Sequence, residues 1–198
     1  MAGRLEFARA VSRRKFVPPM NAPALTSYRL FKTASAREVA VLLAVAWFVP
    51  FAVHLAPWSG VRPLGAYLLP MFWTSFMAAY FYGPKIGALT GFFAPAVNLL
   101  VTGLPAWRFL SVMSGELVVF ALITAWAVCR FPRFFLLAPI VCILTVLIST
   151  AIQVVASAGF SVAALGEPLG QAVVDGFAGL TVLSAINAVL VGFYPKAK

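Results

Sequence analysis

A small set of polar side chains interrupts an otherwise very apolar chain, and these side chains could bind a small water-soluble molecule. The set comprises Asn98, Arg108, Glu116, Gln153, Glu167 and Asp175. The carboxylates of Glu116 and Asp175 accept hydrogen bonds from amines or ring N–H groups. Arg108 suits a carboxylate or a phosphate, and the amides of Asn98 and Gln153 both donate and accept. A few such groups on an apolar wall are typical of a ligand site.

Aromatic side chains near these polar groups could stack on a flat ring of the ligand. Tyr67, Trp107 and Phe160 are candidates, whereas Trp58 is more typical of an anchor at the membrane interface. His54 is the only histidine, and the two cysteines, Cys129 and Cys142, do not have metal-ligand spacing. We therefore predict a binding site without a metal ion or cofactor.

The same residues do not form a convincing catalytic set. An intramembrane hydrolase needs a nucleophile with a base, a pair of acids, or a metal site. Glu116 and Asp175 could form an acid pair, but no other feature supports one. The chain also has no Walker-type glycine-rich loop before a lysine, so we expect that it does not hydrolyse ATP itself. We predict that the protein is not an enzyme.

The elements that position these residues are predicted to be membrane-spanning helices. The 198-residue chain is 63% hydrophobic and 10% charged, which is too apolar for a soluble domain of this size. Apolar runs of about 20 residues fit a hydrocarbon core roughly 30 Å thick. We predict an all-α, integral membrane bundle of six helices, in a domain of residues 38–198 that follows a basic arm of residues 1–37. The predicted spans are 38–56, 64–82, 86–101, 109–129, 135–158 and 170–193.

The distribution of basic residues predicts the orientation of this bundle. Thirteen of the fifteen lysines and arginines lie in the N-terminal arm, the C-terminus and the loops on one side of the predicted bundle. Only Arg62 and Arg108 lie on the other side. Basic residues concentrate in cytoplasmic segments, so we expect both termini in the cytoplasm of a bacterial inner membrane. The same asymmetry explains the net charge of +10 without nucleic acid. The basic arm could contact anionic lipids or be a disordered tail.

The stretch GALTGFFAPAVNLLVTGLP, residues 87–105, places glycines, prolines and Asn98 in a predicted span. We expect these residues to break the regular backbone where the helix lines a polar pocket rather than lipid. The alternative is structural, with Glu116 paired to Arg108 and Asn98 capping a neighbouring turn. Gly83, Gly87 and Gly91 recur every four residues, which favours close packing of the next helix.

Small residues also recur every four positions in the first predicted span. Ala36, Ala40 and Ala44 would form one smooth stripe that lets another helix approach closely. The pattern alone is compatible with docking of a partner helix and with packing inside the bundle.

The segments YFYGPKIGALTGFFAPAVNLLVTGLP and SGELVVFAL resemble the substrate-binding subunits of energy-coupling factor transporters, which bind vitamins or related micronutrients. The resemblance covers the first four predicted spans. It rests on a Gly-Pro-x-x-Gly turn at residues 83–87, on Pro95 and Asn98, and on an acidic residue early in the fourth helix, Glu116. The family also has a small-residue stripe in its first helix, which matches Ala36, Ala40 and Ala44.

The resemblance implies a six-helix bundle with a substrate pocket open to the outside. From the side-chain chemistry described above, we predict that the substrate-binding residues of this pocket are Tyr67, Asn98, Trp107, Arg108, Glu116, Gln153 and Asp175. The resemblance also implies that the alanine stripe docks on a transmembrane coupling subunit, with an ATPase pair supplying energy, although some members could act alone. Two other classes remain open, a structural scaffold of the cell-shape type and a small secondary transporter. A scaffold does not need an outer polar cluster, and a transporter usually has internal repeats.

Overall fold

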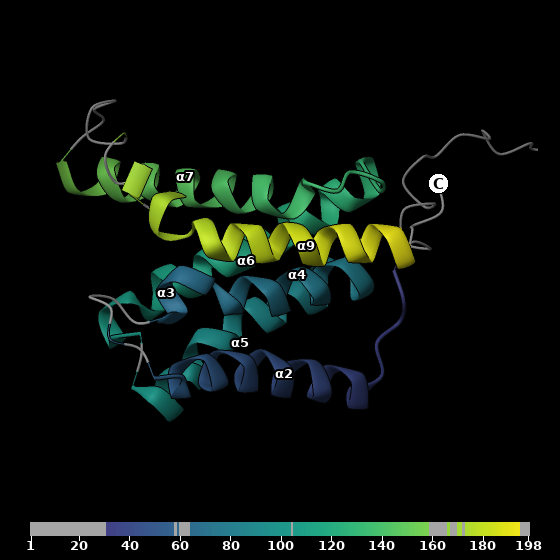
Figure 1. Ribbon diagram of the computed structural model, residues 1–198, viewed down its shortest axis with the longest axis horizontal. Helices are drawn as coiled ribbons and strands as arrows, with labels where there is room; N and C mark the ends of the chain where they lie inside the picture. Colours follow the sequence, from purple (N-terminus) through teal and green to yellow (C-terminus); the bar gives the residue numbers. More distant parts are fainter. Residues whose placement is uncertain are drawn as a thin grey trace, which may run out of the picture.

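The computed structural model describes residues 31–57, 59, 64–103, 105–158, 166, 170–171 and 173–194. Within these ranges every regular element is a helix (Figure 1). The helices are α2 (Ala36–Leu55), α3 (Leu64–Leu68), α4 (Pro70–Tyr82), α5 (Pro84–Thr102), α6 (Trp107–Arg130), α7 (Leu137–Ala158) and α9 (Phe177–Phe193). The all-α prediction is confirmed for the described part of the chain.

Four of these helices are long and apolar enough to cross a membrane, namely α2, α5, α6 and α7. The shortest of the four candidate segments has 18 residues, which corresponds to about 27 Å at 1.5 Å per residue and nearly matches a hydrocarbon core. A membrane protein therefore fits the structure. The six uninterrupted spans that we expected are not present, because the second and sixth are divided.

The expected span 64–82 is divided at Leu69 into α3 and α4. Leu69 has a left-handed backbone with φ of 52°, and Pro70 occupies the first turn of α4. Proline is favourable there but disfavours a helical conformation in the residue before it. The break packs against α9, where a Cβ at Gly179 would lie 2.7 Å from the carbonyl carbon and oxygen of Leu68. Glycine at position 179 therefore allows α9 to contact the break.

The expected span 170–193 is also divided, near its start. Residues 170–171 and 173–175 are helical, but Gly176 forms a turn before α9 begins. Helix α9 itself has 17 residues, or roughly 26 Å of length. The expected continuous helix is thus a shorter helix with a separate helical segment before it.

Helices α4, α5 and α6 form the closely packed centre of the protein. Gly83 has φ of 84° and ends α4, and Pro84 begins α5 immediately afterwards. A Cβ at Gly87 would lie 2.8 Å from Ala79, and a Cβ at Gly91 would lie 2.8 Å from the backbone of Leu117. Without side chains at these positions the helix backbones approach closely, as small residues allow in membranes. The predicted packing role is confirmed for Gly87 and Gly91, whereas Gly83 forms the turn and a Cβ there would lie 2.9 Å from the Phe31 ring.

The backbone of α5 is continuous, which corrects our expectation of a break in residues 87–105. Helix α5 runs from Pro84 to Thr102 with Pro95 inside it, and Gly103 ends it with φ of 73°. Gly91, Pro95 and Asn98 are buried on the core-facing side. The small residues serve helix packing here, so their presence in an apolar segment does not require a pocket beside α5.

One end of the bundle gathers most of the basic residues that the structure describes. The start of α2, the turn between α4 and α5 and the turn between α6 and α7 lie together at the right of Figure 1. This basic end comprises Lys32, Arg37, Lys85, Arg130 and Arg133. Contacts between distant segments hold it together. The Lys32 amide donates to the carbonyl of Phe81 at 2.9 Å, and the Tyr80 hydroxyl donates to the carbonyl of Tyr194 at 2.9 Å.

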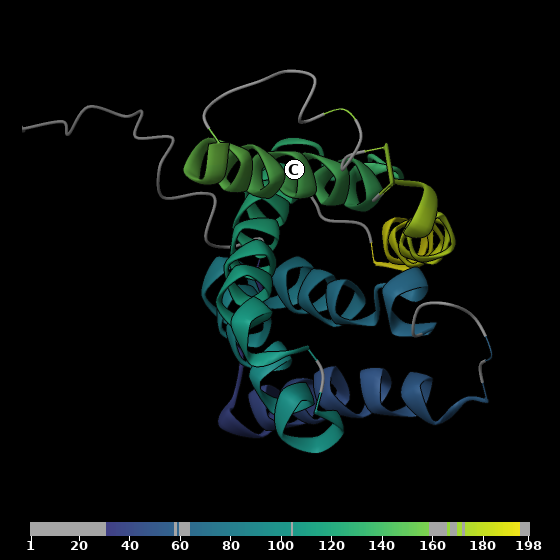
Figure 2. The same cartoon turned by 90° about the vertical axis from the view of Figure 1, so that its left-hand side faces the viewer.

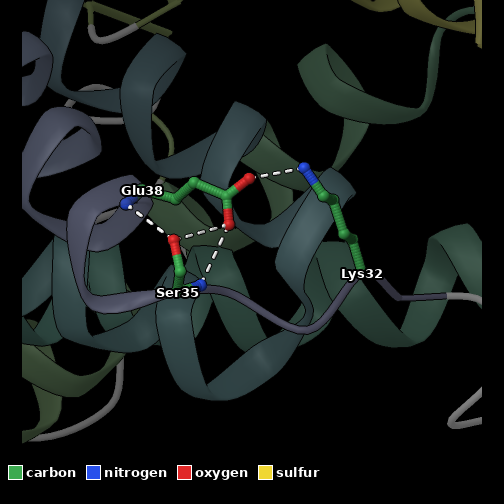
Figure 3. Close-up of polar contacts among 3 residues, drawn as sticks. All are labelled: Lys32, Ser35 and Glu38. Atoms are coloured by element: carbon green, nitrogen blue, oxygen red, sulfur yellow. Dashed lines mark hydrogen bonds and ion pairs between the residues drawn. The ribbon is translucent and has the colours of Figure 1, made fainter.

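The first turn of α2 is fixed at this basic end by a capping box (Figure 3). The Glu38 amide donates to Ser35 Oγ at 3.3 Å, and the Ser35 amide donates to Glu38 Oε2 at 2.9 Å. Lys32 Nζ forms an ion pair with the other oxygen of Glu38. The hydrogen bond to Glu38 and its charge raise the pKa of Lys32. The cap satisfies backbone donors that would otherwise be left without partners at the helix start.

Candidate ligand-binding site

The candidate site is a groove between α6 and α7, towards the end of the bundle opposite the basic end. The two helices are connected by the turn at residues 131–136, and next to this turn α7 is buried at Leu137, Ala138, Val141 and Cys142. Beyond Thr145 the described side chains of α7 are half-buried or exposed. Figure 2 shows the cause, because α6 runs across the stack of helices and meets α7 at an angle. The diverging halves leave a groove of about 230 Å³.

The groove combines an apolar wall with a few polar side chains. Val112, Val119, Ile148 and Ile152 form the wall, and Gly115 lies on it. Polar atoms come from Ser111, Glu116, Thr145, Ser149 and Gln153. An apolar wall with a few convergent polar groups is the usual construction of a small-molecule site.

Three of the polar side chains in the groove, those of Glu116, Ser149 and Gln153, are neighbours. The Gln153 amide nitrogen donates to Ser149 Oγ at 3.2 Å. Ser149 is in turn a neighbour of the Glu116 carboxyl group, and both residues line the groove. Because Ser149 Oγ accepts from Gln153, its own proton is available for Glu116. Glu116, Ser149 and Gln153 therefore lie together on the groove lining.

The sequence-predicted residues Glu116 and Gln153 thus come together, although they are 37 positions apart. Ser111, Gly115, Thr145 and Ser149 belong to the same groove but were not among the predicted site residues. A spacing of four places Ser111 and Gly115 on one face of α6, and Ser149 and Gln153 on one face of α7. That spacing is a usable signal, but serines and a glycine in a membrane helix are usually attributed to packing.

Arg108 and Trp107 lie at the start of α6, outside the groove lining. Arg108 is exposed, and its guanidinium carbon lies 4.8 Å from the centre of the Phe109 ring. It is eight residues from Glu116, or about 12 Å along the helix axis. In the described part of the chain these two residues form no ion pair, so the structural alternative for Glu116 is wrong. Trp107 is 78% exposed, one turn from Ser111 on the same face.

Three further predicted residues are also placed away from the groove lining. Asn98 is 1% exposed on the core-facing side of α5. Tyr67 is half-buried in α3, which packs against α9. Asp175 accepts a hydrogen bond at 2.9 Å from the Gln171 amide, just before α9. Their part in ligand binding stays a prediction, and the structure does not bring them to Glu116.

Several predictions lie outside the described residues. Trp58, Arg62, Phe160 and Glu167 are not described, nor is the side chain of His54. The same holds for residues 1–30 of the basic arm. Within the described ranges, no group of three His, Cys, Asp or Glu side chains could hold a metal ion.

The alanine stripe of α2 faces away from the bundle. Ala36, Ala40 and Ala44 are all exposed. The side of α2 that packs on the bundle is marked instead by Ala46, which is 1% exposed, and by Pro50. Two residues correspond to about 200° around a helix, so Ala44 and Ala46 lie on opposite sides. Packing inside the bundle is therefore not the role of this stripe.

Comparisons with protein-family models, with curated proteins and with solved structures found no match to this chain.

Proposed function

We propose that this protein is a membrane-embedded binding subunit for uptake of a vitamin or related micronutrient. The observation that carries the proposal is the groove between α6 and α7, where Glu116 and Gln153 converge on a mostly apolar wall. A carboxylate within a candidate membrane span is costly and marks a functional site by default. Glu116 has no ion-pair partner among the described residues that would give it a purely structural role.

The proposed orientation places the basic end in the cytoplasm of a bacterial inner membrane. The basic residues at that end, Lys32, Arg37, Lys85, Arg130 and Arg133, support this orientation through the positive-inside rule. The groove then lies in the outer half of the bundle, where it can receive a substrate from outside. In this proposal six segments cross the membrane, with the divided segments 64–82 and 170–193 as the second and sixth.

The exposed alanine stripe supports a second part of the proposal, which is docking of a transmembrane coupling subunit associated with an ATPase pair. This arrangement follows the resemblance to energy-coupling factor transporters. A smooth surface at Ala36, Ala40 and Ala44 permits close approach of a partner helix. We expect Ala40→Trp to abolish co-purification with the partner while ligand binding is retained. Co-purification equal to wild type would show that the stripe faces only lipid.

The test of the binding function is native mass spectrometry of the protein purified from cells grown in rich medium. We expect a bound small molecule in the wild-type protein and its loss in Glu116→Ala. Asp175→Ala serves as a comparison, because Asp175 was predicted from the sequence but does not line the groove. A ligand-free mass, unchanged after incubation with a panel of vitamins and their precursors, would contradict the proposal and favour a structural scaffold.

A further inference from the structure

The ionisable residues that line the groove indicate the class of ligand more narrowly than the shape of the groove does. Ten residues line the groove, and Glu116 is the only ionisable one among them. The nearest arginine in the sequence, Arg108, is exposed and lies over Phe109 instead. The groove therefore offers one acidic side chain on an apolar wall, and no lining residue is basic.

Most of the other polar groups in the groove already have partners. The Thr145 hydroxyl donates to the carbonyl of Val141, one turn earlier in α7, at 2.8 Å. The Gln153 amide nitrogen donates to Ser149. A carboxylate has about four acceptor sites, and among the lining side chains Ser149 is the neighbour placed to fill one of them. Glu116 thus retains capacity for a ligand that donates hydrogen bonds.

Charge complementarity decides which donors fit. An uncompensated carboxylate away from water is unfavourable, and a cation with N–H donors restores both the charge balance and the hydrogen bonds. An anionic ligand would place its negative charge beside an acidic side chain on the same apolar wall. A neutral ligand would fill the groove but leave the carboxylate unbalanced.

The volume of the groove indicates how large a ligand, or part of a ligand, it can hold. A volume of about 230 Å³ corresponds to roughly eight water molecules, so a ligand of roughly ten non-hydrogen atoms fits. Val112, Val119, Ile148 and Ile152 surround the space and suit an apolar or aromatic body.

We propose that the groove between α6 and α7 binds a small organic cation, with an ammonium, amidinium or protonated ring nitrogen on Glu116 and an apolar body against the valine and isoleucine side chains. The proposal rests on the proposed binding function and adds the chemical class of the substrate. Ser149 and Gln153 position the carboxylate, and Gly115 leaves space for the ligand body.

The test uses three probes of matched shape and different charge, 3-phenylpropylammonium, 3-phenylpropanol and 3-phenylpropanoate. Their binding is measured by saturation-transfer NMR on ligand-free protein in nanodiscs of zwitterionic lipid. Four proteins are compared: wild type, Glu116→Gln, Gly115→Leu and Gly192→Leu. A Cβ at Gly115 or at Gly192 would meet no atom within 4 Å, so both leucine variants are expected to fold. Gly192 lies outside the groove lining.

We expect the ammonium to bind wild type and Gly192→Leu, at least tenfold more weakly to Glu116→Gln, and not to Gly115→Leu. Stronger binding of the alcohol or the carboxylate, blocked by Gly115→Leu, would overturn the cation assignment and leave the groove as a binding site. Equal binding to all four proteins, or no binding of any probe, would also overturn it. The binding function itself is judged separately, by the molecule that co-purifies with the wild-type protein.

Discussion

The same two helices, α6 and α7, pack closely in one half of their length and leave a groove between them in the other half. Near the connecting turn, α7 buries Leu137, Ala138 and Val141 against the rest of the protein. Towards the other end the two helices separate, and Glu116 and Gln153 line the groove between them. The comparison shows that helix crossing, rather than a break in the backbone, makes the polar space in this bundle.

The largest expected effect on folding comes from adding a leucine side chain to the packed region, compared with adding one beside the groove. Gly91→Leu should prevent accumulation of folded protein, because even its Cβ would lie 2.8 Å from the backbone of Leu117. Overpacking of this kind costs about 1–3 kcal/mol, and more where backbone atoms must move. Gly115→Leu on α6 should fold as wild type does. Yield of monodisperse protein and thermal unfolding in detergent provide the measurement, and equal stability of the two variants would remove the distinction between packed and open regions.

A smaller effect is expected where α9 is attached to the packed half. The buried Asn187 amide donates to the carbonyl of Phe134 in the α6–α7 turn at 3.1 Å. Asn187→Ala should lower the free energy of unfolding by about 1–2 kcal/mol, because the hydrogen bond between α9 and the turn is lost and the removed amide leaves space at a buried position. The matched control is Ser184→Ala on the same helix, whose hydroxyl donates to Leu180 at 2.8 Å within α9. Chemical unfolding should separate the two variants, and identical curves would show that this attachment does not matter.

The smallest effect is expected at the start of α2. Ser35→Ala removes the capping hydroxyl and should cost about 1 kcal/mol, largely confined to the first turn. Hydrogen exchange of the amides of residues 36–39 should be faster in this variant. Thr33→Ala, two residues earlier and exposed, should leave exchange in α2 unchanged. Equal exchange in both variants would mean that the Lys32–Glu38 ion pair fixes the turn without the cap.

The sequence predicts the helical class and much of the packing. Apolar runs locate the helices, and Gly83 with Pro84 locates the turn between α4 and α5. The four-residue glycine repeat predicts the contact of Gly91 with Leu117. These predictions succeed because each depends on local periodicity or on the conformational limits of one residue.

The site was predicted less completely because it depends on a crossing angle that local sequence does not encode. Position along each span predicts Glu116 and Gln153, which line the groove, but it also predicts Asn98, which faces the core. The depth of a residue along its span can thus be read from the sequence. Which side of the helix faces the core cannot, because that side depends on how the helices pack. Ser149 was overlooked because a serine in an apolar helix usually satisfies its own backbone. The break at Leu69 was also missed, although Pro70 was a signal for it.

Uptake is the most direct test of the central claim, that the groove receives a substrate for import. The molecule that co-purifies with the wild-type protein would be isotopically labelled and supplied to cells that produce wild type, Gly115→Leu or Gly192→Leu at equal levels. We expect the labelled molecule to accumulate in cells that produce wild type or Gly192→Leu. In cells that produce Gly115→Leu, we expect accumulation no higher than in cells with the empty vector. Accumulation with Gly115→Leu equal to wild type would contradict the claim.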